Sequence, residues 1–307
     1  MPQPNNALLN TGIVWTSGSA NLALAAADGT TRHQPLAVGQ LVGWHLHGPR
    51  RCIGIWNRET RRQQLCPHRH HIELDAAGSQ CPPCQAADPG RRFARGDELT
   101  DPRTFGLYLA WFAPGLIKVG LTALERGNDR LTEQAAITFA WLAEGPLPAV
   151  RRAERLISGL GECRESIRRD RKVSAWWHLG DPEQRVEQLR DAWHRAVSHI
   201  GGDARLTIRQ PRIHDLAATY GLTTPPLASA REIAALRDGV TLVGRISVVA
   251  GSDLILDTIT GPGLLNTRTL AGWILTRADV RGAAAPPMRP LNPAAAHDQQ
   301  HVPEALF

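Results

Sequence analysis

The stretch that decides the central fold is Phe105-Gly106-Leu107-Tyr108-Leu109-Ala110-Trp111-Phe112, followed by Ala113-Pro114-Gly115 and then by Leu116-Ile117-Lys118-Val119-Gly120-Leu121. The two outer runs are apolar and strand-like, and the Pro-Gly pair between them is a turn signal. The sequence therefore predicts a β-hairpin over residues 105–121.

The chain downstream of this hairpin combines helical and strand patterns. A helix with an Arg-rich face is expected over 125–136 and a third strand over 138–142. A second helix is expected over 148–157, opened by a proline, and a third runs from Asp181 to about Ile200.

The segments on either side of this region are β-rich. Upstream, residues 41–47 alternate as a strand does, and downstream, residues 240–249, 254–259 and 271–275 are strand-like. We therefore expect an α+β fold. Its expected parts are a β-rich N-terminal module over 1–103, a small sheet with helices over 104–200, a C-terminal β-rich unit over 201–281 and a disordered tail over 282–307.

The composition is that of a folded chain with a basic balance. Of 307 residues, 42% are hydrophobic and 21% charged, which argues against extensive disorder. Apolar runs are too short to cross a bilayer, and the first residues lack the pattern of a secretory signal, so a cytoplasmic protein is expected.

The basic residues are almost all arginine. The net charge is +6, and only Lys118 and Lys172 are lysines among 35 basic residues. Arginine binds phosphate through two parallel hydrogen bonds and stacks on bases, so the composition favours a nucleic-acid partner. A genome-wide bias toward arginine codons is an alternative explanation.

Four of the five cysteines are grouped at Cys52-x13-Cys66-x14-Cys81-x2-Cys84. In a cytoplasmic protein such grouping indicates metal binding rather than disulfides, and four thiolates complete a closed tetrahedral zinc site. We predict a structural Zn²⁺ here. His68, His70 and His71 are alternative ligands, free buried cysteines are the alternative without metal, and Cys163 is expected to be a buried thiol.

Short motifs in and after the hairpin resemble those of the GIY-YIG nuclease superfamily. Gly106-Leu107-Tyr108 matches the first motif, and Lys118-Val119-Gly120 matches the second with lysine in place of tyrosine. The resemblance implies an active site built from Tyr108, Lys118, Arg126 or Arg130, and Glu154, with Glu154 holding a catalytic Mg²⁺ or Mn²⁺.

The same region is similar to an uncharacterised family of bacterial and archaeal proteins with a Cys-rich N-terminus. The shared core reads Tyr108-Leu109-Ala110, Lys118-Val119-Gly120-Leu121-Thr122 and Arg130-x-x-x-Gln134. The resemblance is best over residues 105–157 and fainter over the rest of 40–275.

The residue types of the implied site suit phosphodiester hydrolysis. An arginine stabilises charge on the phosphoryl oxygens, a carboxylate holds a divalent ion, and a tyrosine orients or deprotonates water. Each has a structural alternative: Tyr108 as a core aromatic, Arg126 and Arg130 as a solvated helix face, and Glu154 as a member of exposed ion pairs. Lys118 departs from the motif, which has tyrosine at this position. The replacement bears directly on whether the site hydrolyses phosphodiester bonds.

Further cations surround this site along the chain. The basic run 164–177 ends in Trp176-Trp177 and predicts a surface that follows a phosphate backbone. The predicted nucleic-acid-binding residues are Arg151, Arg152, Arg168, Arg169 and Lys172. The alternative is a basic solvated helix whose tryptophans pack inward.

Three functions remain open at this point. The first is a divalent-metal-dependent nuclease, a hydrolase acting on DNA or RNA, with DNA the more expected of the two. The second is a zinc-containing protein that binds nucleic acid through an inactive nuclease fold. The third is an enzyme that uses the fold for a small-molecule substrate, since fold does not fix function.

Overall fold

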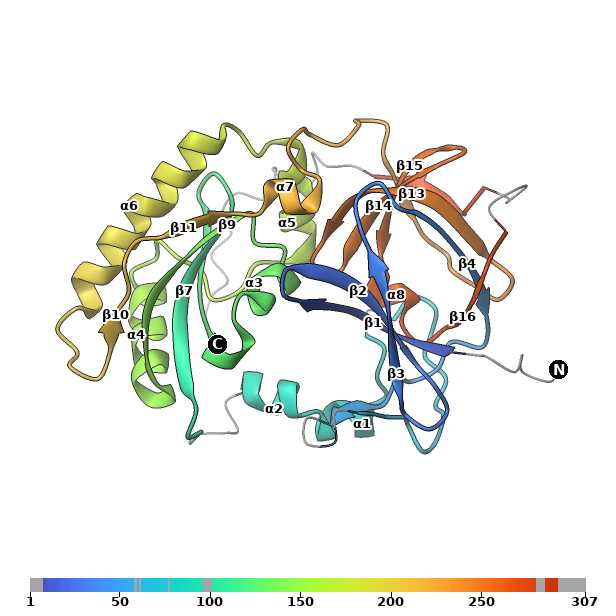
Figure 1. Cartoon of the computed structure of the whole chain (residues 1–307), viewed down its shortest axis with the longest axis horizontal. Coiled ribbons are helices and arrows are strands. Elements are labelled where there is room, and N and C mark those ends of the chain that lie inside the picture. The colour runs from blue at the N-terminus through green and yellow to red at the C-terminus, as the bar shows by residue number, and fades with distance from the viewer. Residues whose placement is uncertain are drawn as a thin grey trace, which may run out of the picture. The chain divides into compact units, whose positions relative to one another are not determined.

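The computed structural model describes residues 8–57, 60, 62–76, 78–95, 101–279 and 285–291 (Figure 1). It divides the chain into two compact units. Unit 1 contains Met1–Asp101, Asn128–Gln134 and Ser229–Arg289, and unit 2 contains Pro102–Gly127, Ala135–Ala228 and Pro290–Phe307. Strands and helices occur together, so the fold is α+β as expected.

Unit 1 is built on one ten-stranded sheet whose order is β17-β12-β15-β14-β13-β4-β16-β1-β2-β3. The strands from the first part of the chain are β1 (Leu8–Thr16), β2 (Ser19–Ala25), β3 (Thr31–Leu36) and β4 (Leu41–His47). Those from the last part are β12 (Arg231–Ile233), β13 (Thr241–Ala250), β14 (Asp253–Thr258), β15 (Gly261–Asn266), β16 (Ile274–Arg277) and β17 (Met288–Pro290).

The N-terminal and C-terminal strands interleave in this sheet. β4 pairs antiparallel with β13 on one side and with β16 on the other, and β16 also pairs with β1. In Figure 1 the blue strand β4 accordingly runs among orange and red strands. The separate N-terminal and C-terminal β-rich units expected from the sequence are therefore one unit here, with the central segment inserted between its halves.

The inward face of β4 shows why this sequence becomes a strand. Val42, Trp44 and Leu46 alternate along it and are buried, while the residues between them are partly or fully exposed. Alternation with a period of two places every second side chain in the core. The expected strand over 41–47 is confirmed.

The helices and strands of the segment that follows β4 are short. These are β5 (Ile55–Asn57), β6 (Arg62–Gln64), α1 (Pro82–Ala87) and α2 (Pro89–Arg95). Both helices begin at a proline, which is favourable at the first helical position because its missing N–H would have no partner there. This polar stretch shows little helical periodicity in the sequence, because such short helices contain too few turns to repeat an apolar pattern.

Unit 2 contains a five-stranded sheet in which β9 (Thr138–Pro146) and β7 (Thr104–Ala113) are central. β8 (Leu116–Ala123) pairs with β7, and β10 (Thr207–Ile208) and β11 (Ile213–Asp215) both pair with β9. The hairpin expected over 105–121 is confirmed as β7 and β8. The third strand is also present and extends past the expected residue 142.

Helices α4 (Leu147–Gly159) and α6 (Pro182–Ile200) pack against this sheet. In α4 the buried residues Val150, Ala153 and Ile157 recur at helical spacing. In α6 the Asp181 side chain caps the first turn by accepting a hydrogen bond from the Glu183 backbone N–H at 2.9 Å. Shorter helices are α5 (Arg169–Ser174), η2 (Ala175–Trp177) and α7 (Ala217–Tyr220), and unit 1 contains α8 (Thr267–Leu270).

The continuous helix expected over 125–136 is wrong. The structure has a short 3-10 helix, η1 (Leu124–Arg126), and a separate α3 (Asp129–Glu133). Gly127 lies between them with φ 49°, a left-handed conformation that ends a right-handed helix and that glycine adopts without strain. The two arginines of this segment consequently belong to different units.

Two further expectations concern the chain ends and membranes. The expected tail over 282–307 lies largely outside the described residues, but 285–291 are described and include strand β17. Among the described residues, no helix combines the length and the apolarity needed to cross a membrane.

Candidate functional site

The four grouped cysteines of unit 1 meet at one point. The Sγ atoms of Cys52, Cys66, Cys81 and Cys84 all lie within 4.8 Å of one another, and all four residues are buried. Cys66 Sγ and Cys81 Sγ are 3.8 Å apart. Four sulfurs bound at about 2.3 Å around one tetrahedral ion would lie about 3.8 Å apart, so the cluster has the dimensions of a metal centre.

Short loops and the start of α1 position these sulfurs. Cys81 is the N-cap residue of α1, so Cys84 follows it within the first turn. The Cys52 sulfur accepts hydrogen bonds from the backbone N–H groups of Gly54 (3.4 Å) and Cys81 (3.2 Å). Gly54 has φ 76°, and a side chain there would strike the backbone of 64–66, so only glycine lets these loops approach.

The thiols differ in how readily they lose a proton. Burial acts to raise the pKa of Cys66, but hydrogen bonds from the backbone N–H groups of His70 and His68 bring it down to about 7. Burial raises the pKa of Cys52 and, more strongly, that of Cys84. Backbone donors aimed at sulfur are suited to a thiolate, the form that binds metal. The cluster could hold a metal ion such as zinc.

The three histidines after Cys66 do not replace a cysteine in this cluster. His68, His70 and His71 are exposed, whereas the four sulfurs gather without them. Cys163 lies in unit 2 as a free buried thiol, as expected, and burial raises its pKa to about 11.

Arg50 is a structural residue that no sequence pattern indicates. Its side chain is 2% exposed, and its guanidinium donates to five backbone carbonyls. Three acceptors, Glu73, Ala76 and Gly78, lie in the loop between Cys66 and Cys81, and the others, Arg268 and Ala271, lie at the α8 end of the sheet. Arg50 therefore fastens the cysteine-bearing loop to the sheet within unit 1.

In unit 2, Tyr108 and Lys118 meet over Gly120. Tyr108 and Gly120 are paired residues of β7 and β8. A Cβ atom built on Gly120 would be 2.5 Å from the Tyr108 hydroxyl oxygen and 3.0 Å from Lys118 Nζ. Both polar groups therefore lie in the space that the missing side chain leaves open.

Tyr108 is nevertheless a core residue as well. It is 1% exposed, and its ring packs edge-to-face on Trp141, with 5.9 Å between the centroids. The Lys118 ammonium donates to the carbonyls of Val119 (3.0 Å) and Glu165 (2.5 Å). The structure therefore shows a buried tyrosine beside a partly exposed lysine whose position is fixed by backbone acceptors.

Glu154, on α4, lies within the electrostatic reach of this lysine. Burial raises the pKa of Glu154, the Lys118 charge opposes that rise, and the neighbouring Glu165 carboxylate adds to it. The Glu165 carboxylate in turn accepts a hydrogen bond from the Ser158 hydroxyl at 2.8 Å. Two carboxylates and one ammonium thus share this part of unit 2, and Glu165 was not selected from the sequence.

The two candidate arginines, Arg126 and Arg130, belong to different units. Arg126 ends η1 in unit 2 and is half-buried, directly after the strand that carries Lys118. Arg130 belongs to α3 in unit 1, is exposed and pairs with Glu133 at 3.4 Å. Arg126 thus shares a unit with Tyr108, Lys118 and Glu154 and lies three residues beyond the end of β8 at Ala123, whereas Arg130 belongs to the other unit.

The predicted nucleic-acid-binding residues make several contacts within the protein. Arg152 lies 4.0 Å from Asp203, and Arg168 pairs with Asp170 at 3.0 Å. Lys172 lies over the Phe112 ring, 4.2 Å from its centroid. Arg151 and Arg169 are half-buried, and Trp176 is buried, as the alternative of inward-packed tryptophans expected.

Comparison with known proteins gives one match. No curated protein and no solved structure matches the chain. A family model described as a protein of unknown function (DUF2797) matches residues 73–275, which is more than half of the chain. The matched region includes Cys81, Cys84 and all the residues gathered around Lys118, and it begins after Cys52 and Cys66. The chain belongs to this family of proteins of unknown function, DUF2797.

Proposed function

We propose that this protein hydrolyses phosphodiester bonds of DNA or RNA at a GIY-YIG-like site in unit 2. The observation that carries the proposal is the meeting of Tyr108 and Lys118 over Gly120, with Glu154 within reach of the Lys118 charge. The chain order of a hairpin (β7 and β8), a third strand (β9) and a helix that carries a carboxylate (α4) supports it, because the motif residues are expected in that order.

The positively charged groups of this site act on the phosphate. Lys118 and Arg126 counter the negative charge that builds up on the phosphoryl oxygens in the transition state. Tyr108 is a positioning residue in this scheme, because its side chain is buried and its hydroxyl adjoins the Lys118 ammonium at Gly120.

Glu154 is the residue that would hold a divalent ion, Mg²⁺ or Mn²⁺. Its carboxylate is a hard oxygen ligand, Glu165 lies close enough to raise its pKa, and Mg²⁺ commonly takes only one or two protein carboxylates. Such an ion supplies positive charge to the phosphoryl oxygens. Separately, we propose that Zn²⁺ occupies the four cysteines of unit 1 as a structural ion, because four sulfur ligands leave no position open for substrate.

A second function, nucleic-acid binding without cleavage, is favoured by one specific observation. Lysine replaces the motif tyrosine at 118, and its ammonium is tied to two backbone carbonyls. An ammonium group held in this way can contact phosphate. No tyrosine stands at position 118 to take part in the hydrolysis. The basic side chains of α4 and α5 would then provide the binding surface.

The test compares wild-type protein with Glu154→Gln and with Glu162→Gln. Glu162 is an exposed residue of the same unit that pairs with Arg195, so it is the matched control. With Mg²⁺ or Mn²⁺, wild type and control should nick supercoiled plasmid, and Glu154→Gln should reduce nicking by about 100-fold or more. DNA binding, followed by fluorescence anisotropy, should change little.

Absence of nicking with either metal contradicts the nuclease proposal. If binding then persists and weakens steeply with salt, the second function is supported. If neither nicking nor binding occurs, both functions are wrong.

A further inference from the structure

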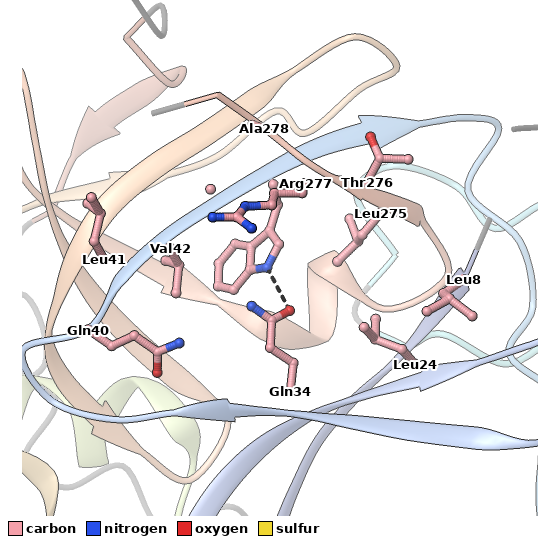
Figure 2. Close-up of a pocket in the computed structure, with 12 residues that line it drawn as sticks. Leu8, Leu24, Gln34, Gln40, Leu41, Val42, Leu275, Thr276, Arg277 and Ala278 are labelled. Atoms are coloured by element: carbon pink, nitrogen blue, oxygen red, sulfur yellow. Dashed lines mark hydrogen bonds between the residues drawn. The ribbon is translucent and has the colours of Figure 1, made fainter. Parts of the chain in front are cut away.

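Unit 1 contains a pocket that the proposed nuclease site does not use. Its volume is about 720 Å³, within the range of sites for drug-sized ligands. It is lined by β1, β2, β3, β4 and β16, with the loop before β4 at its edge. Figure 2 shows the lining side chains.

Strand pairing fixes most of its walls. Trp44 lies directly opposite Arg277 in the β4–β16 pair, and Leu275 lies opposite Leu8 in the β1–β16 pair. Directly paired residues project from the same face of a sheet. These four side chains therefore lie on one face of the sheet. The backbone hydrogen bonds between the strands hold this wall of the pocket in place.

The apolar part of the lining is partly open to solvent. Leu8 and Leu24 are half-buried, whereas Trp44 and Leu275 beside them are buried. Figure 2 shows Leu8, Leu24 and Leu275 gathered on one side. A flat apolar ligand would remove this surface from water, which is favourable by roughly 25 cal/mol per Å² of apolar area.

The polar part of the lining offers hydrogen-bond donors. The side-chain oxygen of Gln34 accepts from the Trp44 indole N–H at 3.3 Å, and that of Gln40 accepts from the Ala37 backbone N–H at 3.0 Å. Each oxygen is thus engaged within the protein, which orients the two amide NH₂ groups as donors. In Figure 2 the Arg277 guanidinium is set apart from both amides.

The charge of the lining is positive. Arg277 is the one charged residue among the lining residues in the described ranges, and none of them is acidic. The pocket therefore suits an anion with a flat apolar body. Such a ligand carries carbonyl acceptors for the two amides and, at another place, a negatively charged group for Arg277. A nucleoside monophosphate combines these features in its base carbonyls, its ring and its phosphate.

We propose that this pocket binds a nucleoside monophosphate unit, either as a free nucleotide or as an unpaired nucleotide of a strand. Arg277 contacts the phosphate, the Gln34 and Gln40 amides donate to the base, and the leucines cover its ring. The assignment is independent of cleavage in unit 2, because it requires neither Glu154 nor a divalent ion.

The test is calorimetric titration of the full chain with uridine 5′-monophosphate, uridine and 4-hydroxybenzoate. Uridine monophosphate should bind with a Kd of about 1 mM or lower, and Arg277→Gln should weaken it about tenfold. Uridine should bind wild type more weakly than the monophosphate. Arg231→Gln is the matched control, since Arg231 is an exposed residue of β12 outside the pocket.

Three results would overturn the proposal. They are no binding of uridine monophosphate, equal binding by wild type and Arg277→Gln, and binding of 4-hydroxybenzoate at least as tight as that of the monophosphate. A single-stranded oligouridylate identifies the source: tighter, Arg277-dependent binding of the oligomer indicates a strand, and equal binding per site indicates the free nucleotide. Glu154→Gln should bind the monophosphate as wild type does, so this test and the cleavage test fail independently.

Discussion

The Tyr108 hydroxyl oxygen lies 2.5 Å from the point at which a Cβ atom on Gly120 would stand. This distance is shorter than any normal contact between a Cβ atom and a nonbonded oxygen atom, so Tyr108 excludes any larger residue at position 120. There is therefore a local physical reason for glycine at this position of the second motif: its missing side chain leaves room for the Tyr108 phenol and the Lys118 ammonium.

Gly120→Ala should destabilise unit 2 and disturb the site. Tyr108 is buried and packs against Trp141, so it has little freedom to yield, and overpacking of this kind costs about 1–3 kcal/mol. The measurement is the free energy of unfolding in urea. Gly159→Ala is the control, because no heavy atom lies within 4 Å of its added Cβ and alanine favours the helix by about 1 kcal/mol. Equal stability of Gly120→Ala and wild type would show that the Tyr108 ring moves freely.

Cys81→Ser should abolish stoichiometric zinc binding and lower the melting temperature. It removes one of four clustered sulfurs, and apparent zinc-binding energies at such sites are about 10 kcal/mol or more. Elemental analysis and calorimetry measure the two effects. Cys163→Ser, which changes a buried thiol of unit 2, should retain the metal. Wild-type protein without stoichiometric zinc would refute the prediction.

Arg50→Met should destabilise unit 1 by about 3 kcal/mol or more, because five carbonyls lose a buried charged donor. Three of these carbonyls lie between Cys66 and Cys81, so transfer of zinc to a chelator should also become faster. Arg51→Met is the control, since the backbone bond from Arg51 to Gly272 survives the change. A variant that unfolds like wild type would show that water replaces the guanidinium without cost.

His214 should make stability fall at mildly acidic pH. Burial and the nearby Arg212 charge lower the pKa of this imidazole, which is stacked on Phe139 with 4.7 Å between the ring centroids. Below a pH of about 6.5 the unfolded chain binds the proton before the folded chain does, so stability is complete above that pH and is lost as the pH falls toward the folded pKa.

Urea unfolding at a series of pH values measures this effect. His214→Phe should show a shallower loss of stability between pH 7 and 5, whereas His199→Gln, an exposed histidine of α6, should keep the wild-type slope. The same slope in all three proteins would mean that other groups govern the acid sensitivity.

The sequence predicted the parts of the fold that depend on local pattern. The β7–β8 hairpin, β9, α4 and α6 each follow from apolar periodicity with a turn or cap signal within a few residues. The grouping of the four cysteines was also predictable, because few roles other than metal binding require thiols so close together in sequence.

What the sequence could not reveal depends on distant pairing. Nothing near Leu41–His47 indicates that β13 and β16, about 200 residues later, lie on either side of it. Arg50 was missed because its acceptors are backbone carbonyls, which have no residue signature. The break at Gly127 was missed because a glycine inside an amphipathic pattern does not by itself end a helix.

The interleaving of β4 with strands from the far end of the chain has a consequence for synthesis. When Trp44 leaves the ribosome, its partner Leu242 has not been translated, and the whole of the inserted sheet emerges first. Unit 2 can therefore complete its sheet on the nascent chain while β4 still lacks its neighbouring strands β13 and β16. Such long-range closure slows folding and leaves β4 open to misassembly until β13 and β16 have been translated.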